Sequence, residues 1–447
     1  MGTILLKNGT VVNEGEVFRG SIVISGDRIS GVFRGTEVPD HILSGAEVVD
    51  MTGLHIFPGV IDTHVHFREP GGGRKGNIES ESKAVALGGV TSFMDMPNNN
   101  PPALSLSLLE EKFLSAQKTS YANYSFYLGA GKDNLQEIKK MNCRDICGVK
   151  LFMGSSTGNL MVEDDKAVED IFRCCPTLLA VHCEDNGIIS ENLKKALSEY
   201  GPDIPPQMHP MIRSAEACLK SSKKAVSLAN RYGTRLHILH VSTKVEADML
   251  SESGNPAITG EACASYLWFC SKDYKTYGNL IKCNPAIKSE EDMMALRKAL
   301  KDGVLKTVGS DHAPHLLEDK QKPYAECPSG IPLGQYIFQM MLSLAKGGVF
   351  TLAEVADRMS HSPARCFALK DRGFIREGYY ADLAVADLDK ECMDLSSPAS
   401  LCGWSPFSGR NFTFPCSVVH TIVNGCFVVR DGALTGKRNS LRLRFDR

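Results

Sequence analysis

Two histidines, His64 and His66, close an apolar stretch that begins at Pro58 and Gly59. Alternate residues of a β-strand point to the same face, so the two imidazoles can meet at one point, as a metal ion requires. Arg68 continues this face, where its planar cation could hold a carboxylate beside a metal. A histidine pair on a half-buried strand is about as often purely structural, so further ligands must decide between the two interpretations.

Further ligand types end other apolar runs, namely Lys150, His182, His240 and Asp311. His237 is a competing candidate, but residues three apart on a strand face opposite ways, and we choose His240 because it lies nearer the strand end. A buried lysine is costly unless it is paired or chemically changed. Each residue alone has an ordinary structural explanation. Their joint occurrence at successive strand ends favours a single metal centre.

Eight strand-like runs alternate with helical patterns through the middle of the chain, which is typical of βαβ units. The runs are 56–67, 90–97, 125–129, 148–153, 178–184, 236–242, 257–262 and 306–315, with helices expected at 106–118, 213–231, 244–252 and 290–301. This order predicts a (β/α)8 TIM barrel of class α/β, in which chemistry sits at the carboxyl ends of the strands.

Both ends of the chain show short alternating runs separated by glycine turns, a pattern typical of antiparallel strands. These runs are 3–6, 21–24, 47–50, 381–387 and 417–429. Because chain ends often lie close together, we expect them to form one small composite β-sandwich domain. The predicted division is 1–55 and 366–447 for this domain and 56–365 for the barrel.

Composition narrows the class of protein. The 447 residues are 43% hydrophobic with a formal net charge of −2, which favours neither a nucleic-acid nor a membrane partner. The sequence has no apolar run of 18 residues and no signal-peptide pattern. Its 15 cysteines are scattered without CxxC pairs, which favours reduced thiols and a cytoplasmic protein. A reactive thiol among them is not expected.

Over essentially its whole length the chain resembles the amidohydrolase superfamily, and within it the cyclic amidases. The resemblance implies two divalent ions, zinc being expected, with CO2 bound as a carbamate on Lys150 that bridges them. It also implies a metal-held hydroxide that attacks a ring amide carbonyl, with Asp311 as the catalytic proton carrier. The implied ligands are His64, His66, Lys150, His182, His240 and Asp311.

Several stretches resemble the dihydroorotases in particular: Arg68 with the Glu-Pro-Gly that follows it, 96–98, 282–285 and 311–315. In that family, Arg68, Asn98 and His315 would bind the substrate carboxylate, and Asn284 its ring. These cationic or potentially cationic groups suit an anionic small molecule. The resemblance implies reversible cyclisation of N-carbamoyl-L-aspartate to L-dihydroorotate in pyrimidine biosynthesis, by a homodimer. The charged loop 316–329 is expected to close over the site.

Two stretches depart from the dihydroorotase pattern. Residues 261–266 lack a histidine pair common after the strand-7 glutamate, and residues 327–334 differ from the usual sequence. Three alternatives therefore stay open. A dihydropyrimidinase, hydantoinase or allantoinase would keep the metals without needing Arg68. A dihydropyrimidinase-related assembly protein would have lost ligands, and a mononuclear deaminase would use no lysine bridge.

Overall fold

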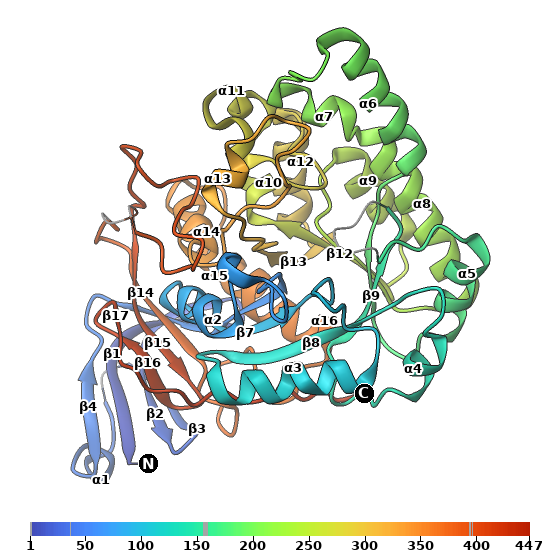
Figure 1. Cartoon of the computed structure of the whole chain (residues 1–447). Coiled ribbons are helices and arrows are strands. Elements are labelled where there is room, and N and C mark those ends of the chain that lie inside the picture. The colour runs from blue at the N-terminus through green and yellow to red at the C-terminus, as the bar shows by residue number, and fades with distance from the viewer. Residues whose placement is uncertain (1, 36, 155–159, 393–394, 396) are drawn as a thin grey trace.

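The middle of the chain forms a barrel of eight parallel strands surrounded by helices (Figure 1). The structure is a computed structural model that describes residues 2–35, 37–154, 160–392, 395 and 397–447. The barrel strands are β6 (Val60–Val65), β7 (Val90–Asp95), β8 (Asn123–Gly129), β9 (Gly148–Phe152), β10 (Leu179–His182), β11 (Leu236–Ile238), β12 (Ile258–Cys263) and β13 (Leu305–Gly309). Each of the eight predicted runs overlaps one of them, with bounds that differ by a few residues, so the predicted barrel is confirmed.

The barrel strands lie side by side in chain order, and the first and last strands meet to close the sheet. A parallel bridge joins Val65 to His312, and the His66 amide donates to the His312 carbonyl at 2.8 Å. Because all strands run the same way, their carboxyl ends form one rim. The candidate ligands therefore come from distant parts of the sequence to one end of the barrel.

The first predicted strand, 56–67, is wrong as a single element. The structure divides it into β5 (His55–Pro58), which belongs to the small sheet, and β6 in the barrel. Gly59 separates them, where a Cβ would lie 2.1 Å from the Thr91 side-chain oxygen. Only glycine allows the backbone to pass this close to the neighbouring barrel strand. The split strand thus joins the small sheet to β6, the barrel strand that carries His64.

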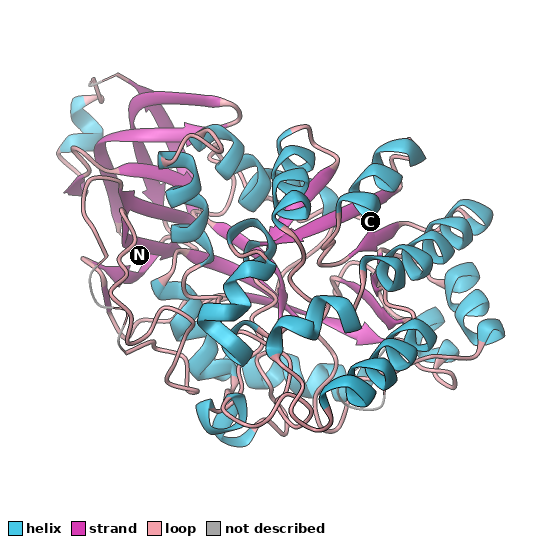
Figure 2. Ribbon diagram, turned by 90° about the horizontal axis from the view of Figure 1, so that it is seen from above, coloured by secondary structure: helices cyan, strands magenta, loops and turns pink. Residues whose placement is uncertain are grey.

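Helices cover the outside of the barrel (Figure 2). They are α2 (Ile78–Leu87), α3 (Leu106–Thr119), α4 (Leu135–Lys140), α5 (Asp165–Cys174), α6 (Asn186–Tyr200), α7 (His209–Ile212), α8 (Ala215–Tyr232), α9 (Lys244–Ser253), α10 (Ala264–Trp268), α11 (Tyr274–Tyr277), α12 (Glu290–Lys301), α13 (Leu317–Lys320), α14 (Ile337–Lys346), α15 (Leu352–Ala356) and α16 (Ser362–Phe367). Side chains that accept a backbone N–H begin many of them, for example Ser214 for α8 and Ser289 for α12. In the described ranges, no helix has the length and hydrophobicity to cross a bilayer.

Strands from both chain ends make one nine-stranded sheet, in which blue and red segments lie together in Figure 1. Besides β5 it contains β1 (Thr3–Asn13), β2 (Glu16–Ser25), β3 (Arg28–Arg34), β4 (Ala46–Asp50), β14 (Leu383–Asp387), β15 (Ser417–Val423), β16 (Cys426–Arg430) and β17 (Ala433–Leu434). Side chains from both ends, including Val11, Ile22, Leu383 and Ile422, share a separate core. The sheet is not wholly antiparallel as expected, because β4 and β5 pair with β1 in parallel.

Candidate metal centre

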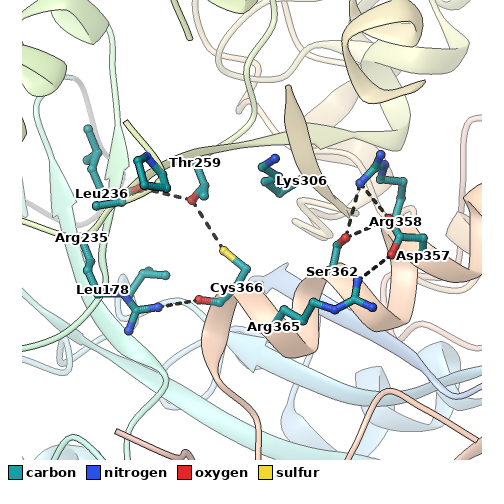
Figure 3. A pocket seen from close by; sticks show the side chains of 12 residues that line it. Leu178, Arg235, Leu236, Thr259, Lys306, Asp357, Arg358, Ser362, Arg365 and Cys366 are labelled. Carbon is teal, nitrogen blue, oxygen red and sulfur yellow. Dashed lines mark hydrogen bonds and ion pairs between the residues drawn. The ribbon is translucent and has the colours of Figure 1, made fainter. Parts of the chain in front are cut away.

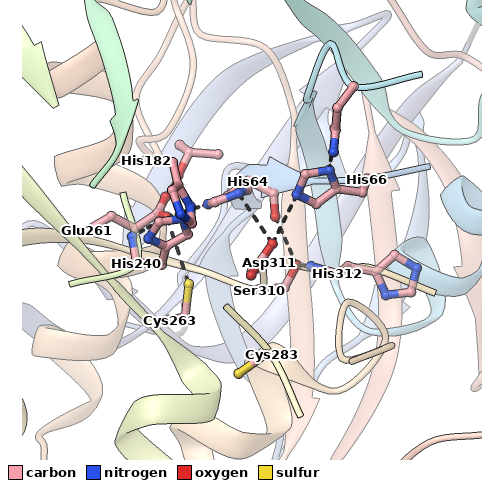
Figure 4. Close-up of polar contacts among 12 residues, drawn as sticks. His64, His66, His182, His240, Glu261, Cys263, Cys283, Ser310, Asp311 and His312 are labelled. Atoms are coloured by element: carbon pink, nitrogen blue, oxygen red, sulfur yellow. Dashed lines mark hydrogen bonds and ion pairs between the residues drawn. The ribbon is translucent and has the colours of Figure 1, made fainter. Parts of the chain in front are cut away.

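Four imidazoles and one carboxylate converge at the carboxyl rim of the barrel (Figure 4). The Nε2 atoms of His64 and His66 lie 3.3 and 3.1 Å from the same oxygen of Asp311. Beside them, the Nδ1 atom of His182 lies 2.9 Å from Nε2 of His240. All five residues line one cavity, which Lys150 also borders. The structure therefore brings all six predicted ligands to a single cavity.

The outer nitrogens of three of these histidines are held by acceptors on the far side of each ring. The pairs are His64 Nδ1 with Glu261 at 2.8 Å, His66 Nδ1 with Asn98 at 2.7 Å, and His182 Nε2 with Glu184 at 3.0 Å. Because each acceptor takes the ring N–H, the opposite nitrogen keeps a lone pair that faces the cavity. Neutral imidazoles presented in this way, beside a carboxylate, fit divalent transition-metal ions.

Glu261 on β12 holds the ring of His64 and the backbone of His240 through hydrogen bonds, a role that the sequence did not reveal. Besides His64, its carboxylate accepts hydrogen bonds from the Thr63 hydroxyl at 2.7 Å and the His240 amide at 3.3 Å. Burial alone would raise its pKa, but His64 and His237 hold the pKa well below its usual range. The available signal was a single acidic residue within the otherwise uncharged strand 258–263.

Lys150 is 1% exposed and lies in the middle of β9. Its ammonium nitrogen lies 4.4 Å from the centre of the Phe152 ring. Burial lowers the pKa of Lys150 to about 7, because a charged amine is poorly solvated there. A large fraction of the side chain is therefore a neutral amine near pH 7. A neutral amine is the form that acts as a nucleophile.

The backbone is unusual at three of the site residues. Arg68, His240 and Asp311 have φ angles of +69°, +40° and +47°, in the left-handed region that side chains other than glycine seldom adopt. His240 and Asp311 each lie two residues after the end of a barrel strand. Burial would raise the pKa of Asp311, but His64 and His66 lower it, so the carboxylate is ionised at neutral pH.

A second group of polar residues lies beside the histidines. Arg68 places a guanidinium nitrogen 3.1 Å from His315 Nε2 and donates through Nε to the Pro314 carbonyl at 3.1 Å. Burial lowers the pKa of Arg68 to about 10, which leaves it cationic at neutral pH. Burial and the Arg68 charge lower the pKa of His315 to about 2. The potential second cation expected from the sequence is therefore a neutral imidazole.

The two asparagines also border the cavity. Asn98 accepts from His66, so its oxygen orients a candidate ligand. The oxygen of Asn284 is buried and has no hydrogen bond within the part of the chain that the structure describes. A buried acceptor without a partner is costly, which marks Asn284 as a group awaiting a donor from a ligand.

The loop 316–330 forms one wall of the cavity through Ser329 and Gly330. The buried Lys320 ammonium group fastens it, with donation to the carbonyls of Lys282, Pro328 and Gly330 at 3.1, 2.9 and 3.0 Å. The segment expected to act as a closing lid is already packed against the barrel in this structure.

A parallel barrel with this set of histidines, a buried lysine and an aspartate at its rim is the architecture of a barrel hydrolase. Residues 55–428 match the model of the amidohydrolase family, and the chain belongs to this family. The predicted resemblance is thereby confirmed.

Curated relatives are similar over nearly the whole chain. A dihydroorotase of Thermococcus kodakarensis is 31% identical over 443 residues, which cover 98% of both chains. A dihydroorotase of Methanothermobacter thermautotrophicus is 30% identical over 87% of this chain and 88% of its own.

Among solved structures, an L-hydantoinase (dihydropyrimidinase) from Arthrobacter aurescens aligns with a TM-score of 0.91 at 26% identity. The alignment covers 99% of this chain and 100% of that one. A dihydropyrimidinase from Brevibacillus agri gives a TM-score of 0.88 at 25% identity over the full length of both chains. The relatives found by sequence and those found by structure thus have names that refer to different substrates. The side chains that line the cavity beside the histidines provide the evidence for choosing between these substrates.

Proposed function

We propose that this protein is a dihydroorotase, which reversibly cyclises N-carbamoyl-L-aspartate to L-dihydroorotate with loss of water. The observation that carries the proposal is the Arg68 guanidinium beside His315 in the cavity that holds the candidate ligands. A buried cation next to a metal centre suits a ring that bears a carboxylate. The dihydroorotases among its relatives support the same choice.

The six rim residues would hold two divalent ions, with zinc as the proposed metal. We assign His64, His66 and Asp311 to one part of the centre and His182 and His240 to the other. Lys150 would carry CO2 as a carbamate, which turns a costly buried amine into an anionic oxygen ligand. When bound, such ions lower the pKa of water towards 7 and polarise an amide carbonyl.

The remaining steps belong to side chains of this protein. Arg68 binds the substrate carboxylate, and the buried oxygen of Asn284 accepts an N–H of the ring. Asp311 is ionised, so it can take a proton and deliver it to the ring nitrogen when the ring opens. In the cyclising direction it removes the ureido proton. Proton transfer of this kind typically contributes about 10²–10⁴-fold.

A second candidate function is hydrolysis of an uncharged cyclic amide. The close structural likeness to a hydantoinase favours it. An uncharged ring would offer Arg68 no carboxylate, so the charge of the buried guanidinium would have no anionic partner in the complex. The two functions therefore differ in what the loss of Arg68 does.

The test is turnover of L-dihydroorotate, dihydrouracil, hydantoin and allantoin after zinc reconstitution in bicarbonate. We expect turnover of dihydroorotate, and a loss of about 10- to 100-fold in kcat/KM for Arg68→Ala, because bonds between charged groups are worth about 1.5–3 kcal/mol. Arg74→Ala is the matched control, since that side chain is 79% exposed. Turnover of uncharged rings at the same rate in wild type and Arg68→Ala would establish the second candidate function. No turnover of any ring by a two-metal protein would contradict both.

A further inference from the structure

A second cavity, of about 410 Å³, lies at the amino ends of the barrel strands, opposite the rim that carries the candidate metal centre. Figure 3 shows side chains that line it. Its walls come from the amino ends of the strands, with Leu236 at the start of β11 and Ala257 just before β12. The other side is formed by α16 and by the π-helix η5 (Asp357–His361). One thiol, Cys366 of α16, borders this cavity and is half-buried.

Cys366 faces His237, a histidine that is not among the candidate metal ligands. Its Sγ atom lies 3.8 Å from His237 Nδ1 and 3.6 Å from the Thr259 hydroxyl. That hydroxyl donates to the Leu236 carbonyl at 3.2 Å, so it accepts from Nδ1, which lies 2.8 Å away. Nδ1 therefore carries a proton on the side that faces the sulfur.

The other nitrogen of His237 faces a carboxylate. Its Nε2 atom lies 4.0 Å from Glu261, within the buried interior of the barrel. Burial alone would lower the pKa of His237, but Cys366 and Glu261 raise it to about 9. Burial would likewise raise the pKa of the Cys366 thiol, but His237 lowers it below its usual value. Both shifts favour a thiolate beside an imidazolium.

The charges around the thiol add to this effect. Four cations and one carboxylate line the cavity, namely Arg235, Lys306, Asp357, Arg358 and Arg365. Asp357 pairs with Arg358 at 2.8 Å and with Arg365 at 3.0 Å, so the remaining charge of the cavity is positive. Reactive cysteines are found in partly exposed, electropositive surroundings of this kind.

We propose that Cys366 and His237 form a covalent modification site for small electrophiles, with hydroperoxides as the natural reagent class. The thiolate sulfur attacks one peroxide oxygen, an S–O bond forms and the O–O bond breaks. The sulfur is oxidised by two electrons to a sulfenic acid while the peroxide is reduced. His237 gives its Nδ1 proton to the leaving oxygen, so hydrogen peroxide releases water and an alkyl hydroperoxide releases an alcohol.

Three other thiols of the chain lie in surroundings that act in the opposite direction. Burial raises the pKa of Cys147 and Cys183 to about 12, which makes them inert as nucleophiles near neutral pH. Cys426 is half-buried like Cys366, yet burial raises its pKa as well. Cys426 is therefore a matched internal control for exposure.

The first test labels the full-length, zinc-loaded protein with iodoacetamide from pH 6.5 to 8.5 and quantifies each cysteine peptide by mass spectrometry. Because His237 lowers the pKa of the Cys366 thiol, a larger fraction of it is thiolate at each pH, so we expect its rate to exceed that of Cys426 and to fall less steeply as the pH drops. A thiol below its pKa loses about tenfold per pH unit, so Cys426 should slow by about a hundredfold. If Cys366 follows Cys426, or stays unlabelled while Cys426 reacts, the proposal is wrong.

The second test treats the same protein with hydrogen peroxide in the presence of dimedone, which traps sulfenic acids. We expect the adduct on Cys366 and its absence in Cys366→Ser. His237→Gln should lower the iodoacetamide rate of Cys366 at pH 6.5 by at least tenfold, because the imidazolium is lost. If His237→Gln does not fold, the pH dependence of iodoacetamide labelling in the wild-type protein decides whether Cys366 is reactive. Peroxide treatment without a Cys366 adduct would overturn the peroxide chemistry.

Discussion

The Nε2 atom of His315 lies 3.1 Å from a guanidinium nitrogen of Arg68 and also 3.1 Å from the carbonyl oxygen of Ser329. A ring nitrogen either donates or accepts a hydrogen bond, so it cannot satisfy both neighbours at once. A substrate carboxylate bound by Arg68 would accept from the guanidinium and leave His315 to donate to the Ser329 carbonyl. Binding of an anion therefore relieves a conflict that the free cavity contains.

His315→Asn should accordingly raise the KM for L-dihydroorotate by about tenfold and change kcat less, because the variant loses the conflict that anion binding relieves, and this relief acts equally on ground and transition states. Initial rates in both directions provide the measurement. Ser329→Ala is the control, since its carbonyl is part of the backbone and remains. An unchanged KM in the His315 variant would exclude this residue from the carboxylate site.

Glu261→Gln should weaken zinc binding by about 10- to 100-fold, because the amide cannot hold the His64 ring as strongly in its metal-binding tautomer. Competition with a chelator measures the affinity directly and does not require turnover. Glu246→Gln is the comparison variant. That buried carboxylate bonds to Ser222 at 2.7 Å and to Thr243 at 2.8 Å rather than to a candidate ligand. Equal zinc affinity of the two variants would count against an orienting role for Glu261.

Zinc uptake should depend on bicarbonate, since the neutral form of Lys150 must gain CO2 to become an anionic ligand. We expect two ions per chain with bicarbonate, fewer in CO2-free buffer, and a carbamate signal in carbon-13 NMR with labelled CO2. Lys150→Met should abolish both the signal and the dependence. Lys288→Met, at another buried lysine that donates to the Ala286 carbonyl at 2.9 Å, should retain them. Full zinc uptake without CO2 would refute the carbamate.

Stability should fall as the pH drops through the acid range, partly because of Glu81. Burial opposes its charge, but hydrogen bonds from His312, Ser400 and Leu401 lower its pKa. A folded pKa below the unfolded value of about 4.3 adds stability that is complete above that value and is lost as the pH falls towards the folded pKa.

Urea midpoints between pH 6 and pH 3.5 test this contribution. Glu81→Gln should be less stable at pH 6 and should show a flatter decline, whereas Glu318→Gln, with a side chain 64% exposed, should follow wild type. Parallel declines for all three proteins would mean that Glu81 does not contribute to the acid sensitivity.

Regular alternation made the barrel predictable, because strands buried on both faces read as apolar runs and the helices between them carry clear capping residues. The position of Asp311 or His182 at a strand end was equally visible. The break at Gly59 was not, since it depends on contact with Thr91, which lies 32 positions away in the chain and approaches only after folding.

The supporting shell of the site was also beyond the sequence reasoning. Glu184 pairs with Arg213 and with His182, and no local pattern links the arginine to the other two. The left-handed backbone at His240 likewise arises from the surrounding packing rather than from local preference. Sequence patterns located the candidate ligands, whereas the groups that orient them required tertiary contacts.

The three hydrogen bonds of Lys320 have a thermodynamic consequence for the loop 316–330. They form when the chain folds, so a substrate entering the cavity does not have to order this wall. Calorimetry should then show only a small negative heat-capacity change on binding, set by the surface of the substrate itself. Closure of a mobile loop would bury additional apolar surface and make that change much larger.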